Sequence, residues 1–350
     1  MWHIQLTGNP DELGRTYARL LKAKLSYYLP ETRKNLRYHE RGDKLTALCK
    51  RIFQNIADSF PCLAREIEGC ADEMSMSKED MVMLVAINDF WWGLDYSRSP
   101  SMEGGKSAAY GDCTNLGIRR NCMEPLFAQT YDLPDPGSFF VQTLRPDGGF
   151  SMILVPRIAP AQTHCGVNER GLCLGSVSSS CNTQNLDGIP INVILRAILQ
   201  NCASIQEAVK LIKKHRVLSG GYTVQVMQEN GDSAVMEVSA ARVEVIESDK
   251  PYLFNTRFTN PKMREYYKKI PKGFCEKRAE NRLRTFERLL QNEAQPYSLD
   301  TMKRVLSDHS PEGPIWDWST PLGIVMFPRR KSVSVYEGAP DISRAESYGL

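Results

Sequence analysis

The sequence lacks the features that would mark a secreted or membrane-spanning protein. Its first residues show none of the basic, apolar and small-residue zones of a signal peptide, and no run approaches the roughly 18 apolar residues of a membrane span. The formal charge is only +3, from 44 basic and 41 acidic residues, which leaves no strong field for nucleic acid or an anionic membrane. We therefore expect a cytoplasmic protein whose partner is a small molecule, with no nucleic acid and no membrane involved.

Metal and redox motifs are also missing. Ten cysteines are present, but no two of them show the C-x-x-C spacing that is typical of zinc and redox sites. Scattered cysteines in an intracellular protein are mostly reduced, buried thiols. The pattern predicts no cofactor, and it leaves Cys113 as the one cysteine whose position needs a separate explanation.

Two halves of different character meet near residue 112. Residues 1–92 read mainly as helices, because apolar residues recur at helical spacing and Asn9 with Pro10 forms a helix start. Residues 97–112 are small and polar, as in a loop. Short strand patterns and blocks of helices follow. Strands in blocks and helices in blocks predict a layered α+β fold, not a parallel βαβ array.

The periodicity predicts individual elements as well. In the first half, helices are predicted from residue 10 and at 45–60, 61–74 and 77–92. In the second half, strands are predicted at 126–131, 138–144, 150–155, 162–177, 222–228, 233–238, 242–246, 322–327 and 332–336, and helices at 190–201, 204–215, 276–292 and 298–307. Gly171 can take the positive φ of a hairpin turn, and Ser204 with Glu207 indicates a capping box.

Asp112-Cys113-Thr114 stands where the loop enters the strand-rich half. If the bond before Cys113 is cut, this cysteine gains an α-amine with a pKa near 8, which is close enough to neutrality to take the proton from its own thiol. No histidine is then needed, and none of the five histidines lies in an evident cysteine-protease signature. We therefore predict self-cleavage between Asp112 and Cys113, with Cys113 as the nucleophile.

Several short motifs follow one another along the chain. They are MWHIQLTGNPDELG, Asp112-Cys113-Thr114, Ala128-Gln129-Thr130-Tyr131-Asp132, Gly166 to Leu172, Phe254-Asn255-Thr256-Arg257 and Gly338-Ala339-Pro340. In their order and spacing they resemble the acyl-coenzyme A:6-aminopenicillanic acid acyltransferase family of N-terminal-nucleophile (Ntn) hydrolases. The resemblance covers nearly the whole length. It implies a four-layer αββα sandwich preceded by a helical N-terminal segment, and a proenzyme that is cut into residues 1–112 and 113–350, which stay associated.

The same resemblance implies a role for five residues. Cys113 would be the nucleophile with its freed amine as base, Asp132 would orient that amine, and Thr114 would assist the cleavage. The backbone N–H of Asn168 and the side chain of Asn255 would stabilise the negative charge on the attacked carbonyl oxygen. Loss of one such donor typically raises a barrier by about 3 to 4 kcal/mol. The substrate would be a small linear amide or an acyl thioester.

Other functional classes stay open at this point. A non-catalytic binding protein on the same fold would remain uncut, and Asp112 and Thr130 both differ from the residues usual in the family. A thiol protease would be active as an uncut chain and would need one of the histidines, which are His3, His39, His164, His215 and His309. Hydrolysis and acyl transfer also stay open, because both pass through the same thioester.

Overall fold

The computed structural model defines ten helices and fourteen strands within the residues it describes. The described residues are 1–36, 38–92, 113–118, 122–132, 139–246, 252–254, 258–266, 275–293, 295–312, 314–316 and 320–350. The helices are α1 (Pro10–Asn35), α2 (Tyr38–Ser59), α3 (Pro61–Met74), α4 (Lys78–Val85), α5 (Ile87–Trp92), α7 (Ile191–Asn201), α8 (Ile205–Lys214), α9 (Pro261–Arg264), α10 (Cys275–Gln291) and α11 (Leu299–Leu306).

The strands form two sheets. Sheet A has the order β1 (His3–Gly8), β4 (Val141–Pro146), β5 (Met152–Val155), β6 (Cys165–Asn168), β7 (Cys173–Gln184), β8 (Ser219–Met227), β9 (Ser233–Ser239) and β10 (Val243–Ile246). Sheet B has the order β11 (Tyr252–Phe254), β2 (Thr114–Ile118), β3 (Leu126–Tyr131), β12 (Leu322–Phe327), β13 (Ser332–Glu337) and β14 (Ala345–Gly349). Apart from the parallel β1–β4 pair, neighbouring strands run antiparallel.

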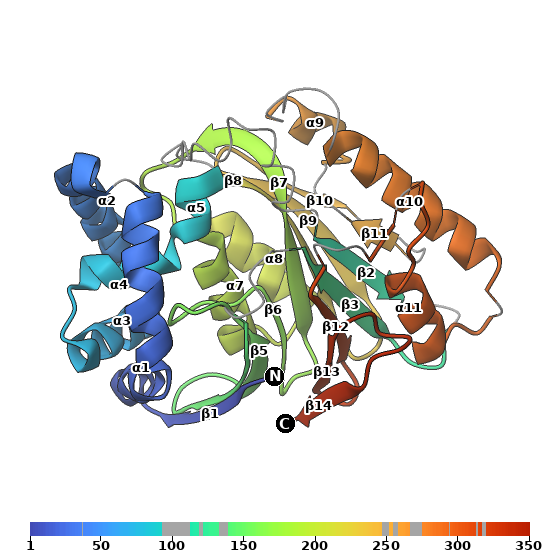
Figure 1. Ribbon diagram of the computed structural model, residues 1–350, viewed down its shortest axis with the longest axis horizontal. Coiled ribbons are helices and arrows are strands. Elements are labelled where there is room, and N and C mark those ends of the chain that lie inside the picture. Colours follow the sequence, from blue (N-terminus) through green and yellow to red (C-terminus); the bar gives the residue numbers. More distant parts are fainter. Residues whose placement is uncertain are drawn as a thin grey trace.

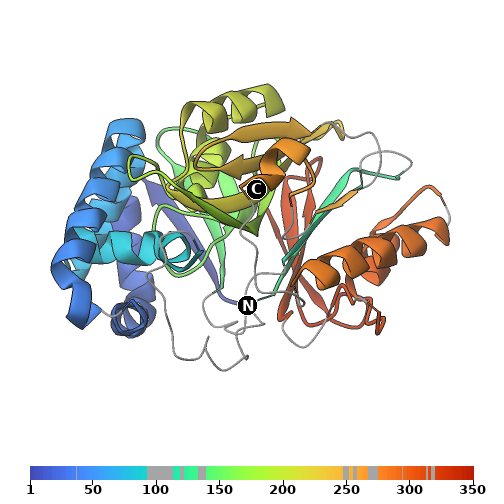
Figure 2. The same ribbon diagram turned by 90° about the horizontal axis from the view of Figure 1, so that it is seen from above.

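The two sheets stack face to face, and helices cover both outer faces (Figures 1 and 2). One apolar cluster packs the helices α1 through α5, together with α7 and α8, against the outer face of sheet A. Another cluster packs α10 and α11 against sheet B. A third cluster fills the space between the sheets. Because its residues are covered from both sides, β3 is buried along its whole length. The predicted α+β, four-layer αββα sandwich is therefore confirmed.

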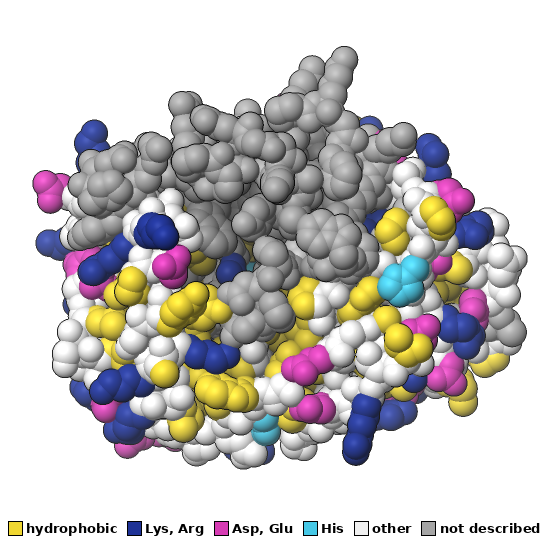
Figure 3. Space-filling view, viewed as in Figure 1, with side chains coloured by type: hydrophobic (Ala, Val, Ile, Leu, Met, Phe, Trp, Pro, Cys, Tyr) yellow, Lys and Arg dark blue, Asp and Glu magenta, His cyan; other side chains and the backbone are white. Residues whose placement is uncertain are grey.

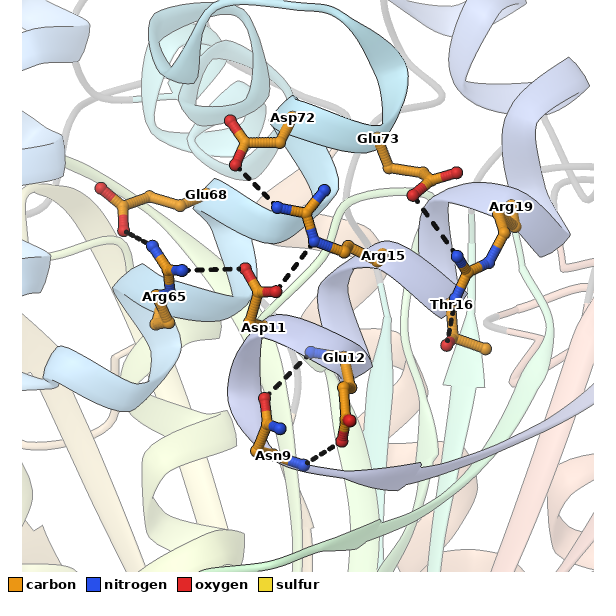
Figure 4. A network of polar contacts seen from close by, with 10 residues as sticks. All are labelled: Asn9, Asp11, Glu12, Arg15, Thr16, Arg19, Arg65, Glu68, Asp72 and Glu73. Carbon is orange, nitrogen blue, oxygen red and sulfur yellow. Dashed lines mark hydrogen bonds and ion pairs between the residues drawn. The ribbon is translucent and has the colours of Figure 1, made fainter.

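Helix α1 begins as the sequence predicts and is fixed tightly to α3. The Asn9 side chain accepts from the Glu12 N–H at 3.1 Å, and the Asn9 N–H donates to the Glu12 carboxylate at 3.1 Å. The backbones then approach closely, since a Cβ at Gly14 would lie 2.0 Å from the Glu66 carbonyl oxygen. Figure 4 shows the ion pairs that bridge the two helices, which are Arg15–Asp72, Arg19–Glu73 and Arg65–Asp11.

Three local predictions need correction. The segment before α1 was interpreted as mainly helical, but residues 3–8 form strand β1, so the part of the chain before Cys113 contributes to sheet A. The predicted helix 77–92 is interrupted at Ala86 and forms α4 and α5. Ser204 does cap α8, but the Glu207 carboxylate accepts from Ala203 N–H at 2.6 Å, so the reciprocal bond of a capping box is absent. The Gly171 hairpin is confirmed, with φ +71°.

Charges of both signs are scattered over the face that Figure 3 shows, in keeping with the small net charge. Within the described ranges, no helix is long and apolar enough to cross a membrane. Among the same residues, no group of three or more histidine, cysteine, aspartate or glutamate side chains is arranged to hold a metal ion.

Candidate functional site

Cys113 lies at the N-terminal end of β2, in the apolar layer between the sheets. It is 7% exposed. Strand β2 is paired on both sides, with β11 and with β3, and the Thr114 N–H also donates to Thr130 Oγ1 at 3.2 Å. The chain immediately after Cys113 is therefore paired on both sides within sheet B. Asp112, the other half of the predicted cleavage site, lies outside the described residues.

The strand register brings Asp132 next to Cys113. Thr114 of β2 pairs with Thr130 of β3, and the two strands run antiparallel. Continuing this register by one residue sets Cys113 opposite Tyr131, directly before Asp132. The sequence separation of Cys113 and Asp132 thus corresponds to one β2–β3 hairpin. Because the two strands are antiparallel, the end of β3 lies beside the start of β2.

Asp132 is part of a buried polar network that links α10, Thr320 and Pro314 to the start of β2. Its Oδ2 lies 2.7 Å from Arg282 Nη1, an ion pair whose side chains are 1% and 0% exposed. Its Oδ1 accepts from Thr320 Oγ1 at 2.7 Å. Arg282 Nη1 also donates to Thr114 Oγ1 at 3.1 Å, and Arg282 Nε donates to the Pro314 carbonyl oxygen at 2.9 Å.

This network places one cation between two of the predicted site residues. The guanidinium of Arg282, from the middle of α10, contacts both the Asp132 carboxylate and the hydroxyl of Thr114, the residue after Cys113. A buried carboxylate needs such a counter-charge, because an unpaired charge in an apolar interior is strongly unfavourable. Asp132 is thereby held in a fixed orientation beside the start of β2.

Sequence reasoning missed Arg282 and Thr320. The predicted helix at 276–292 is rich in basic residues, which ordinarily face water, but Arg282 lies on the buried side of α10 with Ala279 and Phe286. These three residues are spaced at i, i+3 and i+7, and this spacing is the helical signal that was available. Leu283, beside it in sequence, is 39% exposed.

Two further ionisable groups lie near Cys113 and stay protonated at neutral pH. Burial raises the pKa of Tyr131 well above its usual value, and burial raises the pKa of Cys165 to about 12. The charge on Cys113 would raise the pKa of both groups further, so the three side chains share one environment. Cys165 is consequently an unreactive thiol at neutral pH. Cys113, which follows the predicted loop 97–112, is the other thiol in this environment.

His164 is the histidine that the structure brings to this region. Its ring packs edge-on against Tyr131, with 5.7 Å between ring centroids, and 6.5 Å from the ring of Phe139. Burial, with the charge of Arg157 as a smaller cause, lowers the pKa of His164 to about 3. Such an imidazole is a weak base at neutral pH, which disfavours a thiol–histidine pair built on it. The side chain of His39 lies outside the description.

Asn168 is placed at the end of β6, where all of its polar groups have partners. Its N–H donates to the Leu172 carbonyl oxygen at 3.1 Å, and its Oδ1 accepts from the N–H groups of Arg170 and Leu172, each at 3.0 Å. Its Nδ2 donates to two carbonyl oxygens at the end of α7. These contacts favour a structural role in the hairpin. An oxyanion donor at this position would require the bond to Leu172 to open.

Asn255 lies outside the described residues, but its neighbour fixes the strand it follows. Phe254, the last residue of β11, pairs with Asn115 of β2. That pair is two residues from Cys113 along β2. The oxyanion role of the Asn255 side chain stays a prediction, and the strand pairing makes β11 a direct neighbour of the strand that carries the nucleophile.

Comparison with solved structures finds several proteins with a partly similar fold. Penicillin V acylase from Agrobacterium tumefaciens shares 16% identity and has a TM-score of 0.45, with 68% of this chain and 86% of that chain covered. A variant of conjugated bile acid hydrolase from Clostridium perfringens shares 13%, with a TM-score of 0.46 and coverage of 68% and 97%. The Caenorhabditis elegans ortholog of N-acylethanolamine-hydrolyzing acid amidase shares 16%, with a TM-score of 0.45 and coverage of 68% and 100%.

Comparison of the sequence gives the family. No curated protein matches this sequence. The model of the family described as acyl-coenzyme A:6-aminopenicillanic acid acyl-transferase matches residues 119–317, which is more than half of the chain and includes Asp132 and Arg282. Cys113 precedes the matched segment. This chain therefore belongs to the acyl-coenzyme A:6-aminopenicillanic acid acyl-transferase family, and it is a C–N amide hydrolase or acyltransferase.

Proposed function

We propose that the chain is a cysteine Ntn hydrolase that cuts itself between Asp112 and Cys113 and then uses Cys113 to cleave, or to transfer, the acyl group of a small linear amide. The observation that carries the proposal is the position of Cys113. This residue directly precedes β2, a strand that is paired on both sides. In the register of β2 and β3, Cys113 lies opposite the residue before Asp132, which forms an ion pair with Arg282.

Self-cleavage consumes one water. The Cys113 sulfur attacks the carbonyl carbon of Asp112, and the peptide nitrogen leaves as the α-amine of Cys113 while a thioester links the two residues. Water then hydrolyses the thioester, giving the carboxyl of Asp112 and the free thiol. The Thr114 hydroxyl is the proposed assistant in this step, and a hydrogen bond of 3.1 Å from Arg282 Nη1 to its oxygen supports this role.

The catalytic cycle uses the new amine as base. It takes the proton from the Cys113 thiol, directly or through one water, and the thiolate attacks the amide carbonyl carbon. The tetrahedral intermediate collapses, and the leaving amine takes the proton back. The resulting thioester passes its acyl group to water in hydrolysis or to a second amine in transfer. Asp132 orients the Cys113 amine, and the Asn255 amide is the proposed donor to the oxyanion.

The two segments remain associated after the cut. Strand β1 lies before the cleavage site and pairs with β4, which lies after it, over six residues. The apolar cluster on sheet A also contains residues from both segments. Separating them would expose this core to water, so the product of cleavage is a stable complex of residues 1–112 and 113–350.

Intact-mass measurement of purified protein tests the proposal. Wild type is expected to give two fragments, 1–112 and 113–350, that co-elute in gel filtration, whereas Cys113→Ala is expected to remain one chain of 39.6 kDa. Cys122→Ala is the matched control, since Cys122 is a half-buried cysteine outside the site, and it should cut normally. A wild-type chain that stays intact while hydrolysing amides would refute the amine as base, and an intact, inactive wild type would favour the binding-protein alternative.

Hydrolysis and acyl transfer can be distinguished by the molecule that accepts the acyl group, which is water in one case and an amine in the other. Cut enzyme is mixed with an activated acyl thioester, with and without added amines, and the products are identified by mass spectrometry. Formation of amide that increases with amine concentration supports transfer. Free acid alone at every amine concentration supports hydrolysis.

A further inference from the structure

A cavity of about 400 Å³ lies on the helical side of sheet A. It is formed by the end of α2, the start of α3, the end of α7 and one face of α8. These helices pack on the outer face of sheet A, whereas Cys113 belongs to the cluster between the sheets. The cavity is therefore separate from the candidate active site. Its volume lies in the range of small-molecule pockets, roughly 300 to 1,000 Å³.

The floor of this cavity is apolar. Phe60 and Leu63 at the α2–α3 junction, Cys202 after α7 and Leu211 of α8 line it, and the first three are less than a tenth exposed. The His215 ring packs on Phe60, with 4.6 Å between centroids. A bound molecule would place an apolar body against these side chains and remove it from water.

The rim is positively charged. Lys210 and Lys214, one turn apart on α8, line the cavity, and neither makes an ion pair with any described residue. The lining also contains one acid, Glu207, whose carboxylate accepts from the Ala203 N–H at 2.6 Å, so two lysines face one acid at the rim. Burial, and then the charge of Lys214, lowers the pKa of His215, so this ring is neutral at pH 7 and adds no further charge.

We propose that this cavity binds a small amphipathic carboxylate, a straight-chain or aromatic carboxylic acid of low molecular mass. The apolar body lies on Phe60, Leu63 and Leu211, and the carboxylate lies between the ammonium groups of Lys210 and Lys214. A neutral or cationic molecule of the same shape gains only the apolar contacts and binds more weakly. The inference uses no residue of the Cys113 site and does not depend on the function proposed for it.

Cys62 offers a direct readout, because it lines the cavity and its side chain is exposed. The Cys113→Ala chain is treated with iodoacetamide, with and without sodium octanoate, and the alkylation rate of the Cys62 peptide is followed by mass spectrometry. With octanoate at about ten times its Kd, mass action leaves about one tenth of the cavities empty, so the rate falls about tenfold. Octylammonium is the matched cation and should slow the alkylation of Cys62 much less at the same concentration. Octanoate should leave the alkylation rate of Cys122 unchanged.

The double variant Lys210→Gln/Lys214→Gln tests the charged rim. It is expected to show the wild-type alkylation rate without ligand, which reports an intact cavity, and to lose the protection by octanoate. The proposal is overturned if millimolar octanoate does not slow alkylation of Cys62, if octylammonium protects equally well, or if the double variant remains protected. Binding of octanoate at the Cys113 site cannot imitate the result, because the signal comes from Cys62.

Discussion

Replacing Arg282 by methionine in the uncut Cys113→Ala chain would remove the counter-charge of Asp132. Both side chains of the pair are essentially inaccessible to water, with 0% and 1% exposure. The substitution keeps much of the apolar volume of the arginine stem but leaves the carboxylate in an apolar interior. The Thr114 hydroxyl and the Pro314 carbonyl oxygen also lose the donor that they share.

The expected cost is large because the remaining charge cannot move into water. Removal of one partner from a buried ion pair typically destabilises a protein by about 3 to 5 kcal/mol, and we expect a loss of this size at neutral pH. Removing the second charge as well relieves the problem. The double variant Arg282→Met/Asp132→Asn is therefore expected to lie within about 2 kcal/mol of the parent, which is well below the sum of the two single costs.

Urea unfolding followed by tryptophan fluorescence measures these free energies, since the chain contains five tryptophans. Arg284→Met is the matched control on the same helix, where the side chain is exposed, and it should change stability by no more than about 0.5 kcal/mol. A cost below about 1 kcal/mol for Arg282→Met, or simple additivity in the double variant, would refute the argument that this pair is buried and coupled.

Two further substitutions test the packing of the helices on each other and on sheet A. Burial raises the pKa of Asp89 to about 8, so the folded chain binds its proton more tightly than the unfolded chain, and this contribution to stability falls as pH rises from about 4 to 8. Asp89→Asn, which keeps an acceptor for Ser219 Oγ, should therefore show a smaller decline of Tm over that range; equal slopes would contradict the assignment. Gly14→Ala should cost about 3 kcal/mol or more in urea unfolding, because its Cβ would meet the Glu66 carbonyl oxygen at 2.0 Å. Gly148→Ala, with nothing within 4 Å, is its control, and similar values for both would disprove the close approach.

Local signals in the sequence predicted the local parts of the fold. The start of α1 could be predicted because Asn9 and Glu12 bond to each other within one turn. Helix α3 could be bounded because Pro61 opens it, and the 168–171 turn because Gly171 takes a positive φ. In each case the residues that decide the structure are neighbours in the chain.

The strands at the ends of the chain were missed for the opposite reason. Strand β1 is short, and its partner β4 lies more than 130 residues away. The alternation of buried Ile4 and Leu6 with exposed neighbours was present, but it is too brief to distinguish a strand from the approach to a helix. Strand β14 is mostly exposed and pairs only with β13, so it carries little apolar periodicity.

The residues of the candidate site also differ in how far they could be predicted from the sequence. Cys113, Thr114 and Asp132 could be proposed from the family resemblance, because they stand in short motifs. Arg282 could not, since its partners lie 150 residues away in Asp132 and 168 residues away in Thr114, and a basic helix ordinarily faces water. The helical spacing with Ala279 and Phe286 indicates a buried side of the helix, but only the fold shows which residues this arginine contacts.

The Arg282–Asp132 pair serves both stability and the proposed chemistry, so loss of activity in Arg282→Met alone cannot assign Arg282 a part in the reaction. Arg282→Lys separates the two. A lysine ammonium keeps the charge beside Asp132, but it lacks the planar fork that reaches Asp132, Thr114 and the Pro314 carbonyl oxygen together. If Arg282 only balances charge, the lysine variant should recover both stability and self-cleavage. If it also positions Thr114, stability should recover while cleavage stays slow.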